Sequence, residues 1–80
     1  NFSVYDSTVL GLIIRYGKIR NFSKHIDKLG HDAKIVAENV LDILNNKKPR
    51  HPEAEKTTRA IIEWQEGGIK PPRNPWFPNG

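Results

Sequence analysis

The fold is decided by the segment Asp32–Asn46, which reads DAKIVAENVLDILNN. Its aliphatic side chains recur at the spacing of one helix face; they are Val36, Val40, Ile43 and Leu44, with Ala33 and Ala37 beside them. Asp32 is a good N-cap, and Asn45 and Asn46 end the pattern. Charged side chains at four-residue spacing are expected to form an exposed row: Lys34, Glu38 and Asp42. The segment therefore predicts an amphipathic helix that packs against other helices.

Three further segments predict helices, running from about Asp6 to Tyr16, from about Asn21 or Ser23 to Leu29, and from Pro52 to the Gly67–Gly68 pair. The first has almost no polar face, so we expect it at the centre of the domain or against a partner, with Asp6 or Ser7 as its N-cap. Its β-branched residues leave a strand as the alternative. Because no strand-like alternation is bounded by hairpin turns, we expect an all-α fold, a compact bundle of about four short helices. The expected core consists of Leu10, Ile13, Phe22, Ile26, Leu29, Val36, Val40, Ile43, Leu44 and Ile61.

The chain has 80 residues, which suits one small domain. We assign residues 1–68 to a helical interaction domain and residues 69–80 to a Pro-rich tail, which carries four of the six prolines. The tail is expected to pack back onto the domain through Trp76 and Phe77. The alternative is a polyproline ligand for another module. The absence of Met predicts a fragment excised from a longer protein.

The composition argues against most enzymes. The chain has no cysteine, which removes disulfides, thiol catalysis and Cys-based metal sites. The histidines are scattered without metal-ligand spacing, and neither a nucleophile elbow nor a Gly-rich phosphate loop occurs. The longest apolar run, Val9–Ile14, is far too short to span a membrane. We therefore expect a non-enzymatic, intracellular binding module with no cofactor, no metal and no membrane partner.

The strongest chemical signal is a basic stretch from Arg15 to Lys34, which holds only two carboxylates, Asp27 and Asp32. Clustered cations attract polyanions, either nucleic acid or an acidic protein segment. We predict that an acidic protein segment is the partner and that six residues bind it: Arg15, Lys18, Arg20, Lys24, Lys28 and Lys34. A second basic cluster follows in Lys47, Lys48 and Arg50.

A small DNA- or RNA-binding domain is the alternative, because His25–Leu41 has the outline of a helix-turn-helix. The second helix of such a motif would expose Glu38 and Asp42 to the phosphate backbone and would offer only Asn39 to base edges. The basic residues gather instead on the loop and helix before it. We therefore expect nucleic acid to bind only weakly and without sequence preference.

In size, charge and element order, the region Ser3–Glu66 resembles the C-terminal nucleocapsid-binding domain of rhabdovirus phosphoproteins, in particular of a plant rhabdovirus. The resemblance implies a helical domain whose basic residues hold acidic, flexible loops of the RNA-bound nucleoprotein. Such a domain tethers the viral polymerase to its template for transcription and replication, in the host cytoplasm or nucleus and in the virion. The residues that it nominates here are Arg15, Lys18, Arg20, Lys24 and Lys28.

Overall fold

The computed structural model describes residues 2–67, with side chains described for residues 2–64. The Pro-rich tail lies outside the described residues, and so does its expected packing through Trp76 and Phe77. Within the described residues the fold is all-α, as predicted, and contains no strand. The helices are α1 (Val4–Tyr16), α2 (Ser23–Asp27), α3 (His31–Leu44) and α4 (Glu55–Gly67), with a short 3₁₀ turn, η1 (Pro52–Ala54), before α4.

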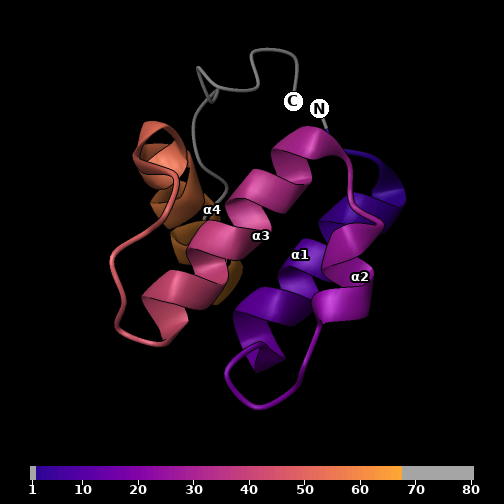
Figure 1. Cartoon of the computed structure of the whole chain (residues 1–80), viewed down its shortest axis with the longest axis horizontal. Helices are drawn as coiled ribbons and strands as arrows, with labels where there is room; N and C mark the ends of the chain where they lie inside the picture. Colours follow the sequence, from indigo (N-terminus) through magenta and orange to yellow (C-terminus); the bar gives the residue numbers. More distant parts are fainter. Residues whose placement is uncertain (1, 68–80) are drawn as a thin grey trace.

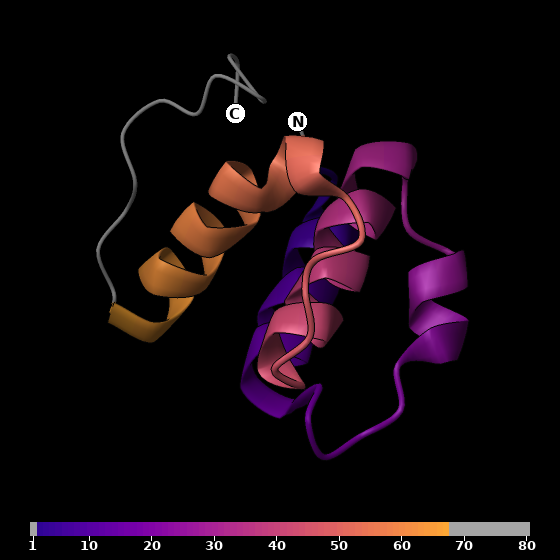
Figure 2. The same ribbon diagram turned by 60° about the vertical axis from the view of Figure 1, so that its left-hand side comes forward.

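Helix α3 is the centre of the arrangement. It packs along α1 and also contacts α2 and α4, which lie on its two sides (Figures 1 and 2). Helix α1, for which the sequence allowed a strand, is a helix of 13 residues. One loop joins α1 to α2 at one end of the molecule, and α3 begins at the other end (Figures 1 and 2). The connector between α3 and α4 then runs back along α3 to η1 (Figure 2).

The helix ends correct two of the predicted caps. Helix α1 begins earlier than expected, because the Ser3 hydroxyl accepts a hydrogen bond from the Asp6 amide at 3.1 Å and so acts as the N-cap. Helix α3 begins at His31 after an N-cap glycine, so Asp32 lies in the first turn, where its charge favours the positive end of the helix dipole. The predicted end of α3 is confirmed: Asn46 has a positive φ of 59°, and the Lys47 amide bonds the Asp42 carbonyl at 2.7 Å.

Most of the predicted core is buried: Leu10, Ile13, Phe22, Ile26, Leu29, Val36, Val40 and Ile61. Leu44 is only partly buried against this cluster, and Ile43 is also half-buried and lies outside it. Both occupy the last turn of α3, at the end of the packed helix. The core also includes residues that were not predicted, among them Val9 and Ile14 of α1. Helix α1 nevertheless leaves Leu12 exposed, whereas α3 contacts each of the other three helices and is the centre of the domain.

Candidate functional site

The α1–α2 loop is folded back onto the end of α1. The Gly17 amide bonds the Ile13 carbonyl at 2.7 Å, and the Ile19 and Arg20 amides both bond the Tyr16 carbonyl at 2.9 Å. A Cβ atom on residue 17 would collide with the Ile13 carbonyl oxygen and would lie 3.1 Å from Leu41 Cδ2, so this close approach requires glycine. The loop is therefore held by backbone bonds and presents its side chains to solvent.

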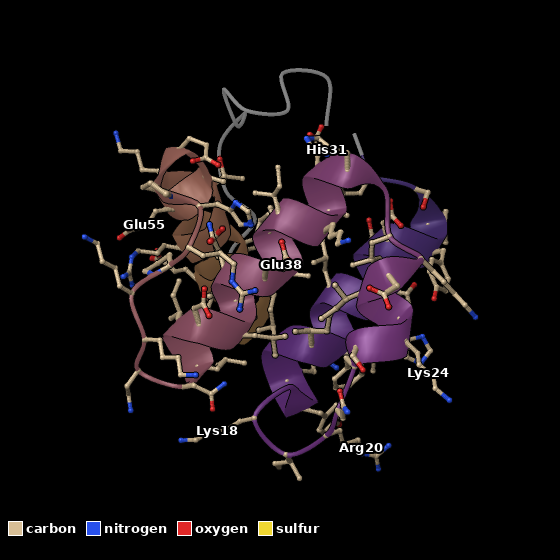
Figure 3. All side chains as sticks on the ribbon, in the orientation of Figure 1. Lys18, Arg20, Lys24, His31, Glu38 and Glu55 are labelled. Carbon is tan, nitrogen blue, oxygen red and sulfur yellow. The ribbon has the colours of Figure 1, made fainter. Side chains whose placement is uncertain are left out.

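Helix α2 and its two flanking residues, Phe22 and Lys28, present lysines to solvent because the apolar side chains of this segment face inward. Phe22 and Ile26 are buried, whereas Lys24 and Lys28, one turn apart, are exposed. The Asn21 carboxamide oxygen accepts a hydrogen bond from the Ser23 amide at 3.0 Å and fixes the entry into this short helix. Figure 3 shows Lys18 and Arg20 projecting from the loop and Lys24 projecting from α2.

Five of the six predicted binding residues come from this continuous part of the chain, and all five are exposed. We call them the basic edge: Arg15, Lys18, Arg20, Lys24 and Lys28. The sixth, Lys34, is also exposed but belongs to the first turn of α3. That turn lies at the end of the molecule opposite the α1–α2 loop, as the position of His31 in Figure 3 shows. The structure therefore does not bring Lys34 together with the loop cations.

The basic edge carries the whole net charge of the chain. Residues 15–28 contain five cations and one carboxylate, a net +4, which equals the formal charge of the full sequence. The remaining eight cations are therefore balanced by eight carboxylates. Among the described residues, none of the five edge cations lies within ion-pair distance of a carboxylate. Arg20 instead stacks over the Tyr16 ring, 6.0 Å from its centroid.

Apolar side chains accompany these cations, and the sequence reasoning missed them as part of the site. Ile19, between Lys18 and Arg20, is 83% exposed. Tyr16 and Leu12, on the last turns of α1, are 44% and 41% exposed. One signal in the sequence could have indicated this exposure. Ile19 follows Gly17 in the turn after α1, and a residue in such a turn lies on no helix face that could bury it.

The polar face of α3 is covered beyond its first turn, which corrects part of the predicted exposed row: Lys34 is exposed, but Glu38 is half-buried and Asp42 is buried. Asn39 is fully buried, and its carboxamide bonds both the His51 carbonyl and the His51 amide at 2.9 Å. Its nitrogen also lies 3.3 Å from the Thr58 hydroxyl of α4. Asn39 therefore fastens the connector and α4 to α3 and is not available to read bases.

The carboxylates of α3 are likewise engaged. Asp42 is buried and accepts three hydrogen bonds from Arg50, two from the guanidinium at 2.9 and 3.0 Å and one from the backbone amide at 3.0 Å. Glu38 lies 2.8 Å from His51 Nε2 and 3.7 Å from the Arg50 guanidinium. These carboxylates therefore have their own cations, and they do not form the free repulsive row on which the sequence argument against nucleic acid rested.

The contact between Asp42 and Arg50 shifts the pKa of both side chains. Hydrogen bonds from the Arg50 side chain hold the pKa of the Asp42 carboxyl below its ordinary value of 3.8, although burial opposes them. The same hydrogen bonds raise the pKa of Arg50. The pair is therefore charged throughout the physiological range.

Other kinds of site find no support in the described part of the chain. No three His, Cys, Asp or Glu side chains there converge as a metal ion requires. Of the described helices, none combines the length and apolar composition needed to cross a bilayer.

Comparison with known proteins yields no match: no family model, no curated protein and no solved structure is significantly similar to this chain. The candidate site therefore rests on the geometry described above.

Proposed function

We propose that this domain is a non-enzymatic adaptor whose basic edge binds an acidic segment of a protein partner. The observation that carries the proposal is the concentration of the net +4 charge in residues 15–28, on exposed side chains that have no carboxylate partner among the described residues. Lys24 and Lys28 lie one helical turn apart, so their charges repel each other. A ligand that brings carboxylates relieves this repulsion.

The partner that we propose is the RNA-bound nucleoprotein of a negative-strand RNA virus, which the domain would tether to the polymerase. The resemblance to rhabdovirus phosphoproteins suggests this partner, and an acidic, flexible nucleoprotein loop has the charge that the basic edge requires. In this role the domain supplies a docking contact, and the polymerase supplies the chemistry.

The covered face of α3 favours a protein partner over specific nucleic-acid recognition. A reading helix must offer free polar side chains to base edges. Here Asn39 is buried against His51 and Thr58, and Asp42 is occupied by Arg50. Binding to nucleic acid is therefore expected to be the weak, salt-sensitive attraction that any basic surface has for phosphate.

The class of ligand is tested by titrating the full chain against a labelled Glu/Asp-rich peptide, short RNA and short duplex DNA. The salt concentration is about 150 mM, where the Debye length is about 8 Å and weak steering is largely screened. We expect the peptide to bind and several nucleic-acid sequences to bind equally weakly. A sequence-dependent dissociation constant below about 1 μM for DNA or RNA would overturn the adaptor proposal in favour of the helix-turn-helix alternative.

The identity of the partner is tested by pull-down with RNA-bound nucleoprotein of a plant rhabdovirus, before and after nuclease treatment of accessible RNA. Capture that survives nuclease and is lost when Lys24 and Lys28 are changed to Glu supports the proposal. Capture that nuclease abolishes would assign the contact to RNA instead.

A further inference from the structure

A row of exposed apolar side chains runs beside the basic edge, formed by Leu12, Tyr16 and Ile19. Leu12 and Tyr16 lie one turn apart on α1 and therefore share a face. Ile19 follows in the turn after α1, where its amide bonds the Tyr16 carbonyl at 2.9 Å. This bond places the Ile19 backbone beside Tyr16, just past the end of the helix. Single exposed apolar residues are ordinary, but three in sequence at spacings of four and three residues are a surface that a partner can cover.

The cations border this row closely. Arg15 is the neighbour of Tyr16 in the last turn of α1, and Lys18 and Arg20 flank Ile19. The Arg20 guanidinium, 6.0 Å from the Tyr16 ring centroid, lies at the boundary between the two kinds of surface. A carboxylate that pairs with Arg20 therefore brings the rest of its own chain into contact with the apolar row.

We infer that the partner segment bound by the basic edge is an acidic amphipathic helix, whose apolar face covers Leu12, Tyr16 and Ile19 while its carboxylates meet Arg15, Lys18 and Arg20. The inference rests on the proposed function and narrows its ligand. The spacing of the row matches apolar side chains at i, i+4 and i+7, which a helix of two turns presents along about 10 Å. A second copy of this chain does not fit, because it would bring two edges of like charge together.

The test uses two labelled helical peptides of identical composition, rich in Glu and containing three Leu. In the first, the Leu residues occupy one face; in the second, they are distributed around the helix. Each peptide is titrated at about 150 mM salt against the full chain, against the two row variants Ile19→Ser and Leu12→Gln taken separately, and against the edge variant Lys18→Glu/Arg20→Glu. Because both row side chains are exposed, the variants should retain the circular dichroism and melting midpoint of the parent.

We expect the one-face peptide to bind about tenfold more tightly than the distributed peptide, and Ile19→Ser to remove most of that difference. The edge variant should weaken both peptides. If the two peptides bind equally and the row variants change nothing, the inference is overturned while the proposed function stands. If the edge variant leaves both peptides unaffected, the proposed function itself fails.

Two further measurements decide between occupants of the row. The first is binding to vesicles that contain anionic phosphatidylserine. Tight binding by the full chain that Ile19→Ser abolishes would overturn the inferred helical partner in favour of a lipid surface. Sedimentation that reveals a dimer, dissolved by Ile19→Ser or Leu12→Gln, would assign the row to self-association. A monomer that ignores such vesicles and prefers the one-face peptide supports the inference.

Discussion

The connector between α3 and α4 pairs its arginine with carboxylates, whereas the α1–α2 region leaves its cations without them. Arg50 makes three hydrogen bonds to Asp42, and on α4 the side chains of Arg59 and Glu55 meet at 3.0 Å. On the basic edge none of the five cations has such a partner among the described residues. In Figure 3, Glu38 lies on α3 and Glu55 at the start of α4, whereas Lys18, Arg20 and Lys24 project from the loop and α2. The difference separates charges that fasten the fold from charges that remain available to a ligand.

The connector uses polar contacts because it has no regular backbone pairing of its own. Asn39 supplies a donor and an acceptor to His51, and this exchange replaces the bonds that a helix or sheet would provide. A hydrogen bond to a charged group contributes roughly 1.5 to 3 kcal/mol, but the Arg50 side chain is 53% exposed, which lowers its share. The basic edge contains no comparable network, so its residues should be replaceable without loss of stability.

The largest loss of stability is expected from a substitution in the hydrophobic core, on which both the connector and the basic edge depend. Val40 of α3 is fully buried, and Val40→Asp would place a carboxylate there without a partner. Such a charge costs several kcal/mol, about as much as the whole stability of a small domain, so the variant should unfold. The control is Val4→Asp, because Val4 is 86% exposed in the first turn of α1. Cooperative thermal melting of Val40→Asp near the parent midpoint would contradict the assignment of Val40 to the buried face of α3.

The next effect belongs to the connector. Asn39→Leu leaves the His51 amide without its acceptor, whereas the His51 carbonyl keeps its hydrogen bond from the Ala54 amide at 3.1 Å. The variant should destabilise the domain by roughly 1 to 3 kcal/mol. Asn45→Leu serves as the matched control, because Asn45 is exposed at the end of the same helix and bonds only the Leu41 carbonyl. Urea unfolding of both variants measures the difference. Equal losses at the two positions would remove the structural role assigned to Asn39.

A smaller effect, dependent on pH, is expected at Asp42. Because its pKa is lowered in the folded state, its stabilising contribution is complete above the ordinary value of 3.8 and is lost as the pH falls through the folded pKa. Asp42→Asn should therefore cost about 1 to 2 kcal/mol near neutral pH. That gap should narrow as the pH drops below 3.8. Urea titrations of parent and variant from neutral pH into this acid range test the sign, and a gap that does not change would contradict the pairing with Arg50.

The smallest effect on stability is expected at the basic edge. Lys24 and Lys28 are exposed and form no ion pair within the described part of the chain. Changing both to Glu should therefore shift the free energy of unfolding by less than about 0.5 kcal/mol. The variant exchanges the repulsion between two lysines for a similar repulsion between two glutamates, so this contribution to stability changes little. A large loss of stability would mean that these lysines hold the fold, as the connector arginine does.

The periodic parts of the sequence predicted the fold well. The face of Val36 and Val40 predicted α3, and Asn46 marked its end. Pro52 was expected to begin the fourth helix, but Pro52–Ala54 form a 3₁₀ turn and α4 begins at Glu55. The cap of α1 was misplaced because Ser3 competes with Asp6 for the same role and lies outside the apolar pattern. The periodicity of one helix does not show which other segment packs over its polar face, and it therefore did not predict that the connector covers α3.

The candidate site was predictable only in its charge. The cations from Arg15 to Lys28 were visible as a run, and the sequence already placed them on a loop and a short helix. The burial of Asn39 and Asp42 was not predictable, because it depends on a connector that turns back across α3 eight and twelve residues later. Lys34 was included by its proximity in sequence, although α3 begins at the opposite end of the molecule.

The most direct measurement compares the affinity of two charge reversals of equal size for the Glu/Asp-rich peptide. One is Lys24→Glu/Lys28→Glu on the basic edge, and the other is Lys48→Glu/Lys56→Glu, at two exposed lysines around the connector. Both lower the net charge equally, so long-range attraction changes alike and only the location differs. We predict that the edge reversal weakens binding at least about tenfold, or about 1.4 kcal/mol, and that the connector reversal weakens it by much less. Equal weakening by the two reversals would contradict a binding site on the basic edge.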